Sequence, residues 1–177
     1  MAFNQPEELI LLSTQTASNS ASLTFTSLIT STYPVYYVKI RSIVPATDVT
    51  SLLMTYSTDN GSTYLATNYL WSLYHYTSNN VRSQTSSTSD SSIILAQKIS
   101  KTSSKDGVSI NLDLFGFGQS IVANIQGQGV LKNIEGYCEG FMAGGLNTTT
   151  TAINAIKFAM SSGNITSGSI SLYGMMM

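Results

Sequence analysis

Apolar and polar residues alternate in several short segments of this chain, and this alternation predicts β-strands with one buried face. In residues 36–43, Tyr36, Val38 and Ile40 are expected to face a core, and the residues between them to face solvent. The same period of two recurs in residues 153–173, on both sides of a connection rich in Gly, Ser and Asn. We therefore predict that residues 153–173 form two antiparallel strands joined by a turn.

Further strands are expected along the whole chain. Asn60 and Gly61 lie between apolar segments, which is a strong signal for a hairpin turn between two strands. Residues 77–92 are polar and of low complexity, so we expect a long exposed loop there. A second exposed connection is expected at residues 143–151. The other predicted strands cover residues 9–12, 22–25, 52–57, 69–76, 93–99, 108–117, 121–125 and 137–141.

The number and spacing of these segments favour an all-β fold. About eight to ten short strands at near-regular spacing, without an amphipathic helix of useful length, are typical of a sandwich or barrel. We predict an antiparallel β-sandwich of jelly-roll type, because double-sheet jelly rolls recur in viral proteins. A chain of 177 residues fits one domain, 1–177. Within it, residues 1–20 are expected to form a partly separate N-terminal strand or arm.

Four segments give the chain a resemblance to a known group of proteins. They read LLSTQTASNSASLTF at 11–25, YYVKIRSIVPATD at 36–48, YSTDNGSTY at 56–64 and SSGNITSGSISLYG at 161–174. In this order they resemble segments of small β-sandwich structural proteins of tailed bacteriophages, which are assigned to tail fibres or to the virion surface. The resemblance spans nearly the whole chain except residues 77–105. It implies a β-sandwich in a virion and carries no active site with it.

The composition adds a statement about the surface. Charged residues make up only 10% of the chain, against about 25% in an average globular protein. Because 42% of the residues are hydrophobic, the low charge does not indicate disorder. A nearly neutral surface of Ser and Thr hydroxyls suits a subunit that packs against copies of itself. We expect a homo-oligomer and take a trimer as its expected form.

Several classes of partner do not fit the chain. The formal net charge is −1, and the eight Lys and Arg residues form no basic stripe of the kind that nucleic-acid binding requires. The N-terminal segment lacks the basic region of a secretory signal. Nothing approaches the roughly 20 consecutive apolar residues of a membrane span. We therefore expect no nucleic-acid partner and no membrane insertion.

Candidate catalytic groups are few. His75 is the single histidine and Cys138 the single cysteine, and we interpret His75 as a core or interface residue and Cys138 as a buried, inert one. One His and one Cys are too few for a zinc site. Glycoside hydrolysis would need two carboxylates close together, for which Asp113, Glu135 and Glu139 are the candidates. We interpret both glutamates as solvated charges at strand edges, and we expect no enzyme activity, no metal and no cofactor.

The strand at residues 69–76 carries large side chains on both faces. The face that holds the single tryptophan is expected in the core, which leaves Tyr74 and Tyr76 for a partner. With Asn79 and Asn80, which follow in the chain, they form the candidate site. It is either an interface between subunits or a contact with a glycan.

Together these observations predict a non-enzymatic structural protein of a bacteriophage virion. The chain is expected to be a homo-oligomeric β-sandwich subunit of a tail fibre or of the virion surface that contacts the host. A capsid decoration protein is the first alternative, and a glycan-binding adhesin or depolymerase module is the second. The expected partners are copies of the chain itself, other virion proteins and a host-surface glycan.

Overall fold

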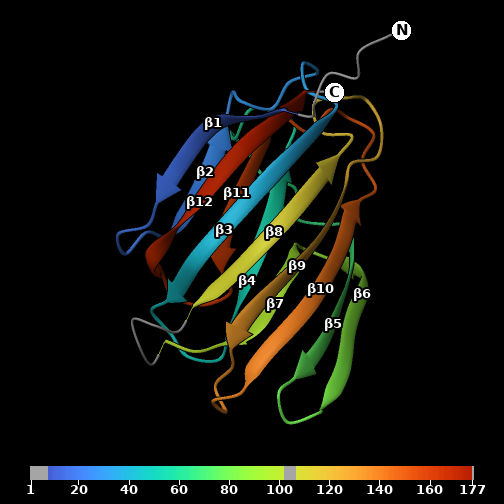
Figure 1. Cartoon of the computed structure of the whole chain (residues 1–177). Coiled ribbons are helices and arrows are strands. Elements are labelled where there is room, and N and C mark those ends of the chain that lie inside the picture. The colour runs from blue at the N-terminus through green and yellow to red at the C-terminus, as the bar shows by residue number, and fades with distance from the viewer. Residues whose placement is uncertain (1–7, 102–106, 177) are drawn as a thin grey trace, which may run out of the picture.

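The computed structural model describes residues 8–101 and 107–176. In these residues the chain forms twelve β-strands and no helix, so the predicted all-β class is confirmed (Figure 1). The strands are β1 (Glu8–Thr16), β2 (Ser22–Thr26), β3 (Val35–Pro45), β4 (Thr50–Ser57), β5 (Tyr69–Thr77), β6 (Arg82–Asp90), β7 (Ile93–Ile99), β8 (Val108–Phe115), β9 (Asn124–Lys132), β10 (Cys138–Asn147), β11 (Ala155–Met160) and β12 (Ile165–Met176).

The strands build two antiparallel sheets. The larger sheet has eight strands in the order β1-β12-β3-β8-β9-β10-β5-β6, and the smaller one has four in the order β2-β11-β4-β7. Figure 1 shows the smaller sheet behind the larger one. Buried apolar side chains from both sheets form one core between them. This arrangement confirms the predicted β-sandwich.

The order of the strands is that of a jelly roll with two inserted hairpins. Strands β1, β2, β3 and β4 pair with β12, β11, β8 and β7, respectively, like the two arms of one long hairpin rolled into two sheets. The hairpin β5–β6 is inserted between β4 and β7, and the hairpin β9–β10 between β8 and β11. Both hairpins join the larger sheet beyond β8, because β9 pairs with β8 and β5 pairs with β10. The insertions thus widen one sheet from four strands to eight.

The alternation of apolar residues correctly predicts which side chains are buried. Tyr36, Val38 and Ile40 on β3 are buried, and so are Ile156 and Phe158 on β11. However, β11 pairs with β2 and β4, whereas β12 pairs with β1 and β3. The predicted pairing of the last two strands is therefore wrong. Alternation identifies the buried face of a strand, and it does not identify the neighbouring strand.

The turn at Asn60 and Gly61 connects the two sheets. Both residues have positive φ angles, 59° and 88°, as a tight turn requires. The backbone N–H of Asn60 donates to Asn154 Oδ1 at 2.8 Å, and its side-chain amide donates to Ser27 Oγ at 2.8 Å. Because β4 lies in the smaller sheet and β5 in the larger, the predicted hairpin at this turn is wrong.

Strand β6 occupies most of the segment expected to be a loop at residues 77–92. Within the described part of the chain it pairs only with β5 and forms the edge of the larger sheet. Its side chains are almost all exposed, so they show no alternation of apolar and polar residues. A strand at a sheet edge with both faces largely exposed can consist of Ser and Thr, and it then looks like a loop in the sequence.

Strands β9 and β10 lie further along the chain than predicted. The segments at residues 121–125 and 137–141 overlap only the beginnings of these strands. The exposed connection expected at residues 143–147 is wrong, because these residues belong to β10. The glycines in β9 and β10 interrupt the alternation of apolar and polar side chains by which strands are predicted. A Cβ atom added at Gly129 would lie 2.4 Å from Phe141 Cζ, so this buried aromatic ring packs directly on the backbone of the neighbouring strand.

Candidate functional site

The larger sheet has an outer face, which we define as the side turned away from the smaller sheet. The register of the strands aligns the outer side chains in rows that run across the sheet. One row consists of Tyr37, Asp113, Gln126, Gly144, Ser72 and Ser86, and the next of Lys39, Asn111, Gln128, Met142, Tyr74 and Gln84. Each row takes one residue from each of β3, β8, β9, β10, β5 and β6, so both inserted hairpins contribute to it.

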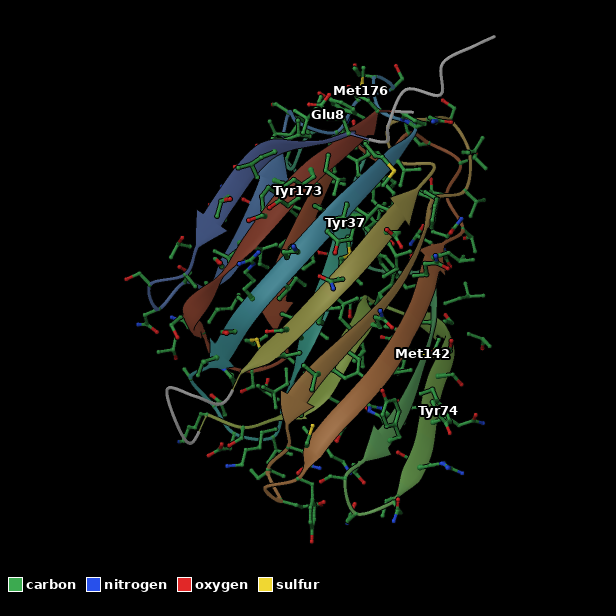
Figure 2. The ribbon with its side chains drawn as sticks, viewed as in Figure 1. Glu8, Tyr37, Tyr74, Met142, Tyr173 and Met176 are labelled. Atoms are coloured by element: carbon green, nitrogen blue, oxygen red, sulfur yellow. The ribbon has the colours of Figure 1, made fainter. Side chains whose placement is uncertain are left out.

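With the exception of Lys39, the residues of these two rows line an open groove of about 900 Å³, which we call the outer groove. A second hollow of about 520 Å³ adjoins it and shares Asn111, Gln128 and Met142 with it. Figure 2 shows Tyr37, Met142 and Tyr74 on β3, β10 and β5 along this side of the sheet. The groove therefore runs across the strands and not along them.

Gly144 leaves the middle of the outer groove open. A Cβ atom added there would lie 3.8 Å from Ser72 Oγ, its nearest neighbour, which is an ordinary contact distance. The backbone therefore does not require glycine at this position. Its effect is that no side chain rises between Gln126 and Ser72, the two residues paired with Gly144 on β9 and β5.

The polar side chains of the outer groove have free hydrogen-bonding capacity. Among residues 8–101 and 107–176, the side-chain amides of Asn111, Gln126 and Gln128 make no hydrogen bond to the protein. Burial raises the pKa of Tyr37 above its ordinary value of 10.0, and the neighbouring Asp113 carboxylate adds to this rise. The groove thus offers amide donors, amide acceptors and one carboxylate on a rigid sheet.

The tyrosines predicted to meet a partner do lie on the outer face. Tyr74 lines the outer groove with 42% of its surface exposed, and Tyr76 lines the adjoining hollow with 53% exposed. The ring of Tyr76 lies over Gly140, where an added Cβ atom would come within 2.5 Å of the ring. The opposite face of β5 is buried, as predicted for the face that holds the tryptophan.

Asn79 and Asn80 lie in the turn between β5 and β6 and do not line the groove. Asn79 accepts a hydrogen bond from the Thr77 hydroxyl, and Asn80 has a positive φ of 64°. Both residues therefore shape the turn. The groove residues Asn111, Gln126 and Gln128 were not predicted from the sequence to bind a partner. Their signal is a polar side chain at every second position, which by itself also describes any solvated strand.

His75 and Glu139 form a buried pair on the inner side of the larger sheet. His75 Nδ1 lies 2.6 Å from Glu139 Oε1, and the side-chain amide of Asn133 donates to Glu139 Oε2 at 3.2 Å. Burial by itself raises the pKa of Glu139. The hydrogen bonds from His75 and Asn133 outweigh this effect, together with the charges of His75 and Lys98, and the pKa lies below its ordinary 4.5. The interpretation of His75 as a core residue agrees with its burial, whereas that of Glu139 as a solvated charge is wrong.

The fold separates the other candidate catalytic groups. Asp113 lines the groove on the outer face, Glu139 points to the inner side, and Glu135 is exposed in the turn between β9 and β10. These carboxylates therefore do not meet at one site. Cys138 is exposed, so its predicted burial is wrong, and it begins β10 opposite Lys132. It forms no pair with His75, whose Nδ1 contacts Glu139.

In the described part of the chain, no group of three or more His, Cys, Asp and Glu residues could hold a metal ion. The same residues contain no helix that is long and apolar enough to span a membrane. No protein-family model and no curated protein matches the chain. The resemblance to structural proteins of tailed bacteriophages therefore stays a prediction, together with the function that it implies.

Proposed function

We propose that the chain is a non-enzymatic structural subunit of a bacteriophage virion, in a tail fibre or on the virion surface, and that it contacts the host cell through the outer groove. The groove is the observation that carries this proposal. It is a broad recess on a rigid sheet, and the described residues that line it are mostly amides, hydroxyls and aromatic or apolar side chains, with the carboxylate of Asp113 among them. Such a site binds a surface and does not enclose a small substrate.

The fold and the composition support the virion part of the proposal. Double-sheet jelly rolls are common in viral structural proteins and in lectin domains. The low charge of the chain suits subunits that pack closely together. The segments that resemble phage structural proteins include most of β2, β3 and β12.

Exposed apolar side chains at the other end of the larger sheet support a homo-oligomer. Leu9 and Leu11 on the edge strand β1 are both exposed, and Leu11 continues the row of Tyr173 and Tyr37. Tyr173 and Tyr37 lie beside each other, with ring centroids 6.1 Å apart (Figure 2). A contact between copies through β1 would cover Leu9 and Leu11 and leave the outer groove free. A trimer is the expected form.

The same apolar edge favours a second candidate, a capsid decoration protein, in which Leu9 and Leu11 would pack on the capsid. Both candidates are tested on purified particles of the phage that encodes the chain. Mass spectrometry should find the chain in the particles, and gold-labelled antibodies should then bind the tail fibres or the head. A chain that is absent from washed particles would contradict both candidates.

A further inference from the structure

We infer that the outer groove binds a neutral, extended polysaccharide that lies across the strands from β3 to β6. This inference takes the source of the ligand, the host surface, from the proposed function. The class of ligand follows from the groove itself, through its length, its hydrogen-bonding groups, its aromatic side chains and its charge.

The length of the groove fits a polymer better than a single small molecule. Tyr37 on β3 and Tyr74 on β5 are four strand spacings apart, which is about 19 Å at the usual interstrand distance. The groove is open along this length, whereas sites for small molecules usually enclose most of their ligand. A chain of several sugar units spans such a distance and can continue beyond both ends of the groove.

The hydrogen-bonding groups fit sugar hydroxyls. Asn111, Gln126 and Gln128 each offer an amide donor and an amide acceptor, and a hydroxyl can use either. The Asp113 carboxylate beside them is an acceptor only, and it can take two adjacent hydroxyls in charge-assisted bonds. Because these amides make no hydrogen bond to any described residue, a ligand can bind to them without breaking one.

The groove also contains aromatic and apolar side chains on which the faces of sugar rings can pack. Sugar rings present C–H groups on their faces, and these pack on the faces of aromatic rings. Tyr37 and Tyr74 lie toward opposite ends of the groove, and Met142 pairs directly with Tyr74 on the outer face. Met142 is 60% exposed, so it is available for such a contact. Tyr74 thus has a role in binding that does not depend on Asn79 and Asn80.

The charge of the groove favours a neutral polymer. Among the described residues that line the outer groove, Asp113 is the only charged one, and it would repel carboxylates of an acidic polysaccharide. Lys39 and Arg41 lie in the adjoining hollow and form no basic stripe along the groove. This arrangement does not fit nucleic acid, whose binding requires the neutralisation of successive phosphates.

An extended peptide also fits poorly. Peptides commonly bind to sheets by adding a strand to a free edge, where backbone groups are unpaired. The floor of the groove consists of β8, β9 and β10, and each of these strands is paired on both sides. The backbone groups of these strands are paired with their neighbours, so the recognition must come from amide, hydroxyl and aromatic side chains.

The test uses the full chain on a microarray of bacterial surface polysaccharides with neutral and acidic repeats. Gly144→Phe should abolish binding, because the ring would fill the floor of the groove where a Cβ atom meets no close neighbour. Gln126→Ala together with Gln128→Ala should weaken binding about tenfold, the expected effect of losing two neutral hydrogen bonds. Thr24→Phe is the matched control, since Thr24 lies opposite Lys157 on the smaller sheet, and it should bind like the unchanged chain. Equal thermal unfolding midpoints would show that the variants are folded.

Binding to neutral polysaccharides that is lost in Gly144→Phe and kept in Thr24→Phe would support the inference. Three results would overturn it: binding to no neutral polysaccharide, binding to acidic ones only, or unchanged binding of folded Gly144→Phe. Asp113→Asn should bind acidic polysaccharides better than the unchanged chain does, and an unchanged preference would contradict the charge argument. The location of the chain in the virion is measured on particles, so either result can fail without the other.

Discussion

The buried Nδ1 atom of His75 lies 2.6 Å from Oε1 of Glu139, although the two residues are 64 positions apart in the chain. They belong to β5 and β10, the strands through which the two inserted hairpins pair with each other. The side-chain amide of Asn133, which follows β9, donates a hydrogen bond to the second oxygen of the same carboxylate. This polar cluster thus connects β5, β10 and the turn between β9 and β10 on the buried side of the sheet.

Because of this cluster, the free energy of unfolding should depend on pH in the acidic range. A carboxylate whose pKa is lower in the folded state stabilises the fold above its unfolded pKa, and this contribution is lost as the pH falls through the folded value. For Glu139 the loss begins below about pH 4.5. We expect the free energy of unfolding to fall as the pH is lowered below about 4.5, measured by urea unfolding with the fluorescence of buried Trp71.

Glu139→Gln should lower the free energy of unfolding at pH 7 by about 2 kcal/mol, because it replaces a charged acceptor in a buried hydrogen bond. It should also reduce the loss of stability below pH 4.5. Glu135→Gln is the matched control, since Glu135 is exposed in the neighbouring turn. An equally steep pH dependence in Glu139→Gln and in the unchanged chain would contradict this role of the carboxylate.

Loss of the side-chain hydroxyl should change the free energy of unfolding in opposite directions at Tyr56 and Tyr69. The centroids of these two buried rings lie 5.4 Å apart. The Tyr56 hydroxyl is buried without a hydrogen-bond partner among the described residues, so Tyr56→Phe should raise the free energy of unfolding by about 1 kcal/mol. The Tyr69 hydroxyl accepts the backbone N–H of Tyr56 at 2.8 Å, so Tyr69→Phe should lower it by about 1–2 kcal/mol.

Urea unfolding measures the free energy of unfolding of both Tyr56→Phe and Tyr69→Phe, and each variant serves as the control for the other. The pairing of β7 with β4 reaches only as far as Met54, so β7 provides no partner for the backbone N–H of Tyr56, and the Tyr69 hydroxyl accepts it instead. A loss of stability in Tyr56→Phe as large as that in Tyr69→Phe would mean that the Tyr56 hydroxyl has a partner in solution.

The sequence predicts the buried faces well and the pairing of strands poorly. Tyr36 and Phe158 are buried as their alternation indicates, because burial of a side chain depends on its own strand and face. Pairing depends on strands far apart in the chain, and the two inserted hairpins add further possible partners. Strand β6 leaves no apolar pattern at all, since neither of its faces is well buried.

The outer groove could be predicted only in part for the same reason. Tyr74 is recognisable as the exposed face of an aromatic strand. Asn111 and Gln128 become neighbours only through the pairing of β8 with β9. Gly144 opens the groove only because the pairing places it between the side chains of Gln126 and Ser72. The burial of Glu139 depends on His75 in the distant strand β5. No local feature of the sequence reports that contact.

The non-enzymatic part of the proposal predicts no hydrolysis of bacterial polysaccharides. Paired carboxylates carry out this reaction when both face the same sugar, and here Asp113 and Glu139 lie on opposite faces of the sheet. Reducing ends released from bound polysaccharide should stay at the level of a protein-free control. A release that disappears in Asp113→Asn and persists in Glu135→Gln would show that the groove is catalytic.

Substitutions at two places on the outer face should separate host contact from assembly. Tyr74→Ala with Tyr76→Ala should weaken attachment to host cells without changing the oligomer mass, because both tyrosines lie at the outer groove and its adjoining hollow. Leu9→Ser with Leu11→Ser should do the reverse, since these residues are exposed on the edge strand β1. Light scattering at micromolar concentration and a cell-binding assay on the same samples measure both properties.

The two pairs of substitutions serve as controls for each other, because all four side chains lie on the outer face of one sheet. If the tyrosine variant falls apart into monomers, the tyrosines hold subunits together and the host contact lies elsewhere. If the leucine variant keeps its oligomer mass, β1 is not the contact between copies. A tyrosine variant with unchanged mass and unchanged attachment would remove Tyr74 and Tyr76 from both roles. A monomer mass for the unchanged chain would contradict the proposed oligomer itself.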